Sequence, residues 1–141
     1  MRGALGESLI KLDDKGRIIL PAKARGALTD GVYLTRGQGE CVFLFSEAQF
    51  DLYTEQNRAA APPGMPAIAF DRVFYSGVVV QDMDKQGRVL VPPNLREYAG
   101  LSRDVAVIGL KQRLELWDAA RWRAYLNDYT PQYSELSEGV R

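Results

Sequence analysis

The chain of 141 residues contains no histidine and only one cysteine. The absence of histidine excludes His-based general acid–base catalysis, the Ser-His and Cys-His nucleophile arrangements and most zinc sites. A single cysteine cannot form an intrachain disulfide, and a reducing compartment is therefore expected. Cys41 lies in the apolar run CVFLF (41–45), which favours a small buried hydrophobic side chain over a reactive thiol.

Long apolar runs, phosphate-binding loops and net charge are also absent. No run approaches the roughly 20 apolar residues of a membrane-spanning helix, and the polar beginning of the chain argues against a secretion signal. The segment GQGEC (37–41) lacks the third glycine of a dinucleotide fingerprint. No paired carboxylates or activated nucleophile mark a catalytic site. We therefore predict a protein without enzymatic activity. A histidine-free enzyme that uses only carboxylates, lysines or Mg²⁺ is the least supported alternative.

The chain contains a duplicated segment, because LDDKGRIILPAKAR (12–25) aligns without a gap on MDKQGRVLVPPNLR (83–96). The apolar runs IIL and VLV also match. The identical pairs are Asp13 with Asp84, Gly16 with Gly87, Arg17 with Arg88, Pro21 with Pro92, and Arg25 with Arg96. Downstream, CVFLFSEAQFDLY (41–53) aligns on RLELWDAARWRAY (113–125). The chain is therefore two copies of one unit of about fifty residues.

Each copy predicts the same succession of elements. An extended run enters a turn with glycine and leaves through a β-branched run, which is typical of a hairpin. The proline that follows begins a short helix. A second hairpin then leads to a helix capped by Ser46 or Asp118. In the last helix Trp122, Tyr125, Leu126 and Tyr129 form an apolar stripe, and the aromatic positions favour packing over base stacking.

The predicted organisation is a first repeat at 1–57, a linker with a short helix at 58–74, a second repeat at 75–129 and a loose tail at 130–141. A unit of about fifty residues has too little core to be stable alone. We therefore expect both repeats to interleave their strands in one intertwined α+β domain.

Two interpretations of the duplicated turn remain open. In the first, Asp13 and Asp84 pair with the arginines four residues later, and Gly16 and Gly87 permit the turn, so that the whole motif is structural. In the second, Arg17 and Arg88 project from matching loops toward DNA, where arginine binds phosphate or guanine bidentately. The protein would then be either a structural or protein-interaction module or a DNA-binding protein.

The charge near the two turns is unequal. Residues 11–25 carry five basic and two acidic side chains, whereas residues 82–96 carry three and two. The first turn is therefore the better phosphate binder, although a charge cluster is commonly a solvated face. The candidate DNA-binding residues are Arg17, Lys15, Arg88, Lys11, Lys23 and Arg25.

With these motifs, the chain resembles the MraZ family, bacterial transcriptional regulators related to the AbrB and SpoVT DNA-binding domains. The resemblance covers the opening RG (2–3), LDDKGRIILP, the linker, MDKQGRVLVPPNLREYAGL and LELWDAARW. It implies a swapped-hairpin, AbrB-like double-split β-barrel with flanking helices, built from the two repeats.

The resemblance also implies a function. The family forms ring-shaped homo-oligomers that bind short direct repeats upstream of their own gene, at the head of the division and cell-wall cluster, and usually repress it. The expected location is the cytoplasm, associated with the nucleoid, without a membrane partner. The family's DNA-contacting arginine corresponds to Arg17; Lys15 and Arg88 carry over less directly, because Gln86 replaces Lys15 in the second copy. No cofactor or metal is implied.

Overall fold

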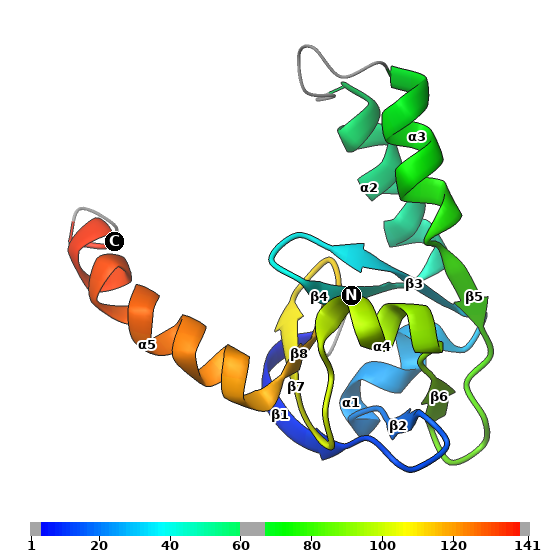
Figure 1. The fold of residues 1–141 in the computed structure, drawn as a ribbon, viewed down its shortest axis with the longest axis horizontal. Helices are drawn as coiled ribbons and strands as arrows, with labels where there is room; N and C mark the ends of the chain where they lie inside the picture. The colour runs from blue at the N-terminus through cyan, green and yellow to red at the C-terminus, as the bar shows by residue number, and fades with distance from the viewer. Residues whose placement is uncertain (1–3, 60–66, 139–141) are drawn as a thin grey trace.

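The computed structural model describes residues 4–59 and 67–138, which form an α+β fold as predicted (Figure 1). The first repeat contains β1 (Leu5–Lys11), β2 (Arg17–Ile19), α1 (Ala22–Arg25), a 3-10 turn (Gly26–Leu28), β3 (Val32–Gly37), β4 (Cys41–Phe45) and α2 (Glu47–Ala59). The remainder contains α3 (Ala67–Ser76), β5 (Val79–Gln81), β6 (Arg88–Leu90), α4 (Pro93–Ala99), β7 (Asp104–Leu110), β8 (Leu114–Asp118) and α5 (Ala119–Leu136).

Both sheets combine strands from the two repeats. The larger sheet has the order β1-β7-β8-β4-β3-β5, and β2 pairs with β6 in a separate two-stranded ribbon. All pairs are antiparallel. In four of these pairs, β1 with β7, β2 with β6, β3 with β5 and β4 with β8, one strand comes from each repeat. Neither repeat therefore completes a sheet by itself.

The predicted hairpins have two different outcomes. The second hairpin of each repeat is confirmed, because β3 pairs with β4 and β7 with β8. The first hairpin is wrong as a local ladder, since β1 and β2 pair with β7 and β6 and not with each other. Strands β2 and β6, which occupy matching positions in the two repeats, instead pair with each other. This exchange buries Ile18 and Val89 completely in the shared core.

The core has an aliphatic part and an aromatic part. The aliphatic part includes Leu20, Leu34, Leu44, Val91 and Leu116, all fully buried. The aromatic part gathers Phe43, Phe45, Phe50 and Trp117, with Tyr53 and Trp122 packed against it. Trp117 therefore packs in the core as expected.

Helix α5 corrects two expectations about the end of the chain. Asp118 caps it as predicted, accepting a hydrogen bond from the backbone N–H of Arg121 (3.3 Å). The helix continues through Pro131 to Leu136, so the prediction of a loose tail is wrong for residues 130–136. The prediction overlooked that Tyr133 and Leu136 continue the apolar spacing of Tyr129, at i+4 and i+7. Tyr125 and Tyr129 are 43% and 49% exposed, so part of the expected apolar stripe faces solvent.

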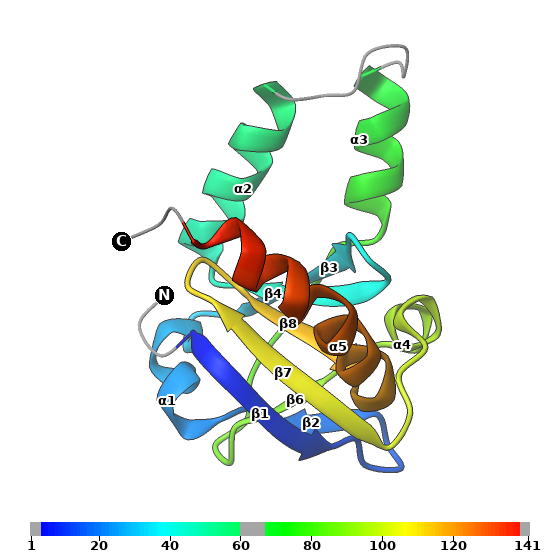
Figure 2. The ribbon, with the colours of Figure 1, turned by 90° about the vertical axis from the view of Figure 1, so that its left-hand side faces the viewer.

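Helices α2 and α3 form an arm that projects from the sheets (Figures 1 and 2). Phe74 on α3 stacks on Phe50 of α2 and also contacts Tyr53, with ring centroids 6.2 and 6.1 Å apart. Nη1 of Arg36, on β3, donates a hydrogen bond to the carbonyl of Val73 (2.9 Å). The predicted linker therefore contributes a helix of ten residues, while 60–66 lie outside the described residues. Within the described parts of the chain, no helix is long and apolar enough to span a membrane.

Candidate nucleic-acid interface

The ribbon of β2 and β6 presents two arginines on its outward face. Side chains alternate between the two faces of a strand, so the burial of Ile18 and Val89 directs residues 17, 19, 88 and 90 outward. Arg17 lies opposite Leu90, and Ile19 lies opposite Arg88. The two arginines thus occupy diagonal positions. Figure 1 shows this ribbon at the end of the molecule opposite to the α2–α3 arm.

The first turn is built around the carboxylate of Asp13. Its Oδ1 accepts hydrogen bonds from the backbone N–H groups of Lys15 (2.9 Å) and Arg17 (2.8 Å), and its Oδ2 accepts from Nε of Arg17 (3.0 Å). Gly16 closes the turn with a φ of 80°, a conformation that strongly favours glycine. The backbone N–H of Arg17 is the main cause that holds the pKa of Asp13 below its ordinary value.

The second turn repeats this geometry. Oδ1 of Asp84 accepts from the backbone N–H groups of Gln86 (2.9 Å) and Arg88 (2.8 Å), and Oδ2 accepts from Nε of Arg88 (2.6 Å). Gly87 has a φ of 82°. The backbone N–H of Arg88 is the main cause that lowers the pKa of Asp84. The duplication therefore extends from the sequence to individual hydrogen bonds.

This geometry reconciles the two interpretations of the arginines. Each aspartate binds Nε of its arginine and fixes the base of the guanidinium. Within the described residues, no hydrogen bond involves the terminal amino groups of Arg17 or Arg88. Their side chains are 32% and 34% exposed. The arginines can therefore lock the turns and still bind an anion or a base edge.

Each turn is also held by the opposite repeat. The carbonyl of Gly16 accepts a hydrogen bond from the backbone N–H of Val91, and the carbonyl of Gly87 accepts one from that of Leu20, both at 2.9 Å. The guanidinium of Arg96 covers Gly16, and that of Arg25 covers Gly87. The two turns are thus anchored on one ribbon.

The other candidate residues differ in whether their side chains already form hydrogen bonds or ion pairs within the protein. Lys15 is exposed, and only its backbone N–H has a described hydrogen bond. Lys11 forms an ion pair with Asp104, and Nζ of Lys23 donates to the carbonyl of Leu5 (3.1 Å). Nε of Arg25 donates to the carbonyl of Leu20 (3.0 Å). Lys15 and Arg17 thus remain the most available cations of the first turn.

Two features in or beside the ribbon were not identified from the sequence. Ile19 and Leu90 belong to continuous apolar runs, yet both project from the outward face. Arg96 was noted only as the counterpart of Arg25, although it covers the first turn. Its alignment with a residue already chosen as a candidate was the signal that could have identified it.

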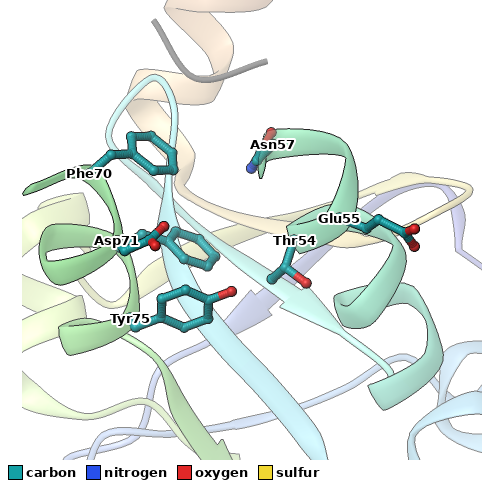
Figure 3. A pocket seen from close by; sticks show the side chains of 7 residues that line it. Thr54, Glu55, Asn57, Phe70, Asp71 and Tyr75 are labelled. Carbon is teal, nitrogen blue, oxygen red and sulfur yellow. The ribbon is translucent and has the colours of Figure 1, made fainter. Parts of the chain in front are cut away.

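A hollow at the other end of the molecule lies between α2 and α3 (Figure 3). Its lining residues are Thr54, Glu55, Asn57, Phe70, Asp71, Phe74 and Tyr75. Among the residues that the structure describes, no three potential metal ligands form a group. Burial raises the pKa of Cys41 to about 12, so this thiol is protonated at neutral pH. The exposed cations of the turns are thus the more distinctive chemical feature of the surface.

Comparison with known proteins identifies close relatives. The model of the MraZ protein family, described as antitoxin-like, matches residues 4–63 and 74–137. A protein of Kineococcus radiotolerans named "Transcriptional regulator MraZ" is 48% identical over 136 residues, which are 96% of this chain and 95% of the relative. A protein of the same name from Paenarthrobacter aurescens is 48% identical over 134 residues, covering 95% and 94%.

Among solved structures, the solution structure of PHS018 from Pyrococcus horikoshii is 17% identical and covers 79% of this chain and 86% of its own. Its TM-score of 0.33 is too low to support an argument about the fold.

Proposed function

The chain belongs to the MraZ family, and from that premise we propose that it is a transcriptional regulator that binds DNA through the ribbon of β2 and β6. Arg17 is the principal DNA contact in this proposal. Lys15 supplies a phosphate contact beside it, and Arg88 acts from the second turn. Following the family resemblance, the target is a set of direct repeats upstream of the protein's own gene, which it represses at the head of the division and cell-wall cluster.

The observation that supports this proposal is that Arg17 and Arg88 are held at Nε, while their terminal amino groups have no hydrogen bond within the described residues. A guanidinium that is held at Nε loses little further conformational freedom when its terminal amino groups bind a phosphate or a guanine. A two-stranded antiparallel ribbon is also narrow enough to enter the major groove of DNA. The net charge of zero is compatible with this role because the cations are local.

The test is fluorescence anisotropy of DNA from upstream of the gene, with a scrambled fragment as control, over a series of salt concentrations. We expect Arg17→Ala to weaken binding by about 5- to 150-fold, the effect of losing a bidentate base contact of about 1–3 kcal/mol. Arg72→Ala is the matched control, because Arg72 is an exposed arginine on α3, far from the ribbon. Arg72→Ala removes the same net charge from the protein, so a loss of affinity that reflects net charge alone would appear in both variants.

The alternative is a structural or protein-interaction barrel whose arginines only lock turns. It predicts that wild type does not prefer the native fragment, or that Arg17→Ala binds it as well as wild type does. Thermal melting of each variant separates a loss of contact from a loss of fold. Repression is tested with a reporter fused to the upstream region: Arg17→Ala should relieve it, whereas Arg72→Ala should not.

We further propose that the protein is a homo-oligomer, a ring in accordance with the family resemblance. The partner in this proposal is a second copy of the chain, and exposed apolar side chains on two helices support such a contact. On α3, Ile68 and Val73 are 56% and 57% exposed; on α5, Tyr133 and Leu136 are 70% and 80% exposed. Several ribbons displayed by one assembly could bind adjacent repeats, and such avidity raises affinity by about 10² to 10⁴ without new contacts.

The assembly is tested by light scattering after size-exclusion chromatography. Tyr133→Glu introduces a charge on the exposed apolar side of α5 and should reduce the size of the assembly. Ser134→Glu introduces the same charge on the same turn of the helix but on a different side, and should not. A wild-type monomer at all concentrations would contradict the proposal.

The proposed fold family is the swapped-hairpin, AbrB-like double-split β-barrel. The exchange of β2 and β6 between the repeats supports this assignment, because each first hairpin finds its pairing partners in the other repeat. An experimental structure with a local ladder between β1 and β2 would contradict it.

A further inference from the structure

Two aliphatic side chains stand between the arginines on the outward face of the ribbon. Ile19 is 50% exposed and Leu90 is 40% exposed, whereas their neighbours Ile18 and Val89 are fully buried. Ile19 lies directly opposite Arg88, and Leu90 directly opposite Arg17. On the outward face of the ribbon, the two arginines therefore lie on one diagonal and the two aliphatic side chains on the other.

The fold does not use these two side chains to fill its core. The inward face of the ribbon already supplies Ile18 and Val89 to the aliphatic core. Single exposed aliphatic residues are ordinary on protein surfaces. This pair differs in its placement, because both side chains lie across from an arginine whose terminal amino groups are available. A ligand that engages the arginines would therefore also cover the aliphatic groups.

We propose that Ile19 and Leu90 determine DNA sequence specificity by contacting the 5-methyl groups of thymines beside the bases that Arg17 and Arg88 reach. This inference rests on the proposed function, DNA binding by the ribbon. In the major groove, guanine presents two acceptors that suit arginine, and thymine presents a methyl group that suits an apolar side chain. The ribbon carries both kinds of partner on a single face.

The spacing of the side chains agrees with the spacing of base pairs. Residues two apart on a strand are separated by about 6.6–6.8 Å, close to two base-pair steps of about 3.4 Å each. Arg17 and Ile19 therefore match bases about two steps apart if β2 follows the groove. On β6, which runs antiparallel to β2, Arg88 and Leu90 form a second arginine–aliphatic pair with the same spacing. The preferred site would combine guanine and thymine at such spacing.

The experiment measures the affinity of the full-length protein for the native upstream fragment and for the same fragment with deoxyuridine in place of thymine. Deoxyuridine pairs as thymine does and lacks only the methyl group. We expect wild type to lose about fourfold in affinity for each contacted methyl group, the effect of exposing one buried methyl. Ile19→Ala should bind the thymine fragment more weakly and should lose about fourfold less than wild type on deoxyuridine substitution, because only the contact of Leu90 remains.

The controls separate contact from indirect effects. Leu52→Ala removes another half-exposed aliphatic side chain, on α2 at the opposite end of the molecule, and should respond to deoxyuridine as wild type does. Ile19→Val keeps a β-branched aliphatic group and should retain part of the deoxyuridine effect. Thermal melting and assembly size are measured for every variant, and Leu90→Ala is tested in the same way.

Each outcome has a distinct meaning. If wild type binds both fragments equally while Arg17→Ala still weakens binding, the thymine contacts are overturned and the proposed function stands. If Ile19→Ala retains the full deoxyuridine effect, the methyl groups act through DNA shape and the inference fails for Ile19. If wild type does not prefer the native fragment, both proposals fail. If a variant changes the size of the assembly but keeps the deoxyuridine effect of wild type, these side chains form contacts between copies of the chain. That outcome also overturns the inference.

Discussion

The guanidinium of Arg96, on α4 of the second repeat, lies over Gly16, in the first turn, and occupies the space where a Cβ atom would be. The same relationship holds in reverse, because Arg25 of the first repeat covers Gly87 of the second turn. Glycine at each turn therefore serves two purposes: it adopts a positive φ and admits an arginine of the other repeat. The positions of the two turns are coupled through these contacts.

Gly16→Ala should destabilise the protein and Gly26→Ala should not. At Gly16 an alanine would adopt a φ of 80° and displace Arg96, and the backbone strain alone is worth about 1–2 kcal/mol. Gly26 has a φ of −58°, and an added Cβ would meet nothing within 4 Å. Urea unfolding should therefore show a lower midpoint for Gly16→Ala only. Equal midpoints for the two variants would contradict the structure of the turn.

Acid should destabilise the fold through Asp13 and Asp84. Both carboxyl groups have a lowered pKa in the folded protein, chiefly because of backbone N–H donors, so folding favours their ionised form. Their stabilisation is present above the unfolded pKa of about 3.9, and it is lost as the pH falls through the lower folded values. Melting temperature should drop steeply over this acidic range.

The double variant Asp13→Asn with Asp84→Asn tests the source of this dependence. It should melt lower than wild type near neutral pH and lose less melting temperature on acidification. Asp14→Asn removes a charge from the same turn without removing any of these hydrogen bonds, and should behave as wild type. An unchanged acid dependence in the double variant would shift the explanation to other groups, such as Asp104, whose pKa is lowered by its hydrogen bond with Lys11.

Cys41 should be unreactive in the folded protein. Burial raises the pKa of its thiol to about 12, whereas a free thiol titrates near 8.5. Its Sγ also lies 3.3 Å from the carbonyl of Gln38, to which the thiol donates. Iodoacetamide at about pH 8.5 should alkylate it only after unfolding in guanidinium chloride, as followed by mass spectrometry. Equal rates in the folded and unfolded states would contradict this burial.

Arg121 should hold the beginning of α5 against the body of the protein. Its guanidinium donates hydrogen bonds to the carbonyls of Gly39 (2.9 Å), Glu40 (2.7 Å) and Ala99 (3.1 Å). Lysine cannot reach all three with the same geometry, so Arg121→Lys should lose about 1–3 kcal/mol of unfolding free energy. Arg123→Lys, at an exposed position of the same helix, should remain within about 0.5 kcal/mol of wild type in chemical denaturation.

The duplication made much of the site predictable. Aligning the two copies identified both aspartates, both glycines and both arginines of the turns, and the structure gives each pair the same hydrogen bonds. The pairing of β2 was not predictable in the same way, because a three-residue apolar run suits a local hairpin as well as an exchange between repeats. Ile19 was missed for a related reason. In the continuous run of residues 18–20, only the register with β6 decides which side chain faces outward.

The differences outside the duplicated turns have two sources, one long-range and one local. Arg25 was predicted as a DNA-binding residue from its charge, and nothing in its sequence neighbourhood indicated that it covers Gly87 in the other repeat. The end of α5 was missed although Tyr133 and Leu136 continue the apolar spacing of Tyr129. A hydrogen bond from the backbone N–H of Ser137 to the carbonyl of Tyr133 (2.9 Å) completes the helix. Local patterns thus predicted the turns better than the elements that surround them.

The pairing of β2 with β6 has a consequence for the order of events during synthesis. Helix α1, strands β3 through β5 and the two helices of the arm all lie between these two partners in the chain. Contacts between such distant segments slow folding, because a large loop must close before they form. On the ribosome, β2 emerges long before β6 and has no partner until β6 follows. The surface that carries both arginines therefore arises only after β6 has been made, and a chain terminated before β6 would not display it.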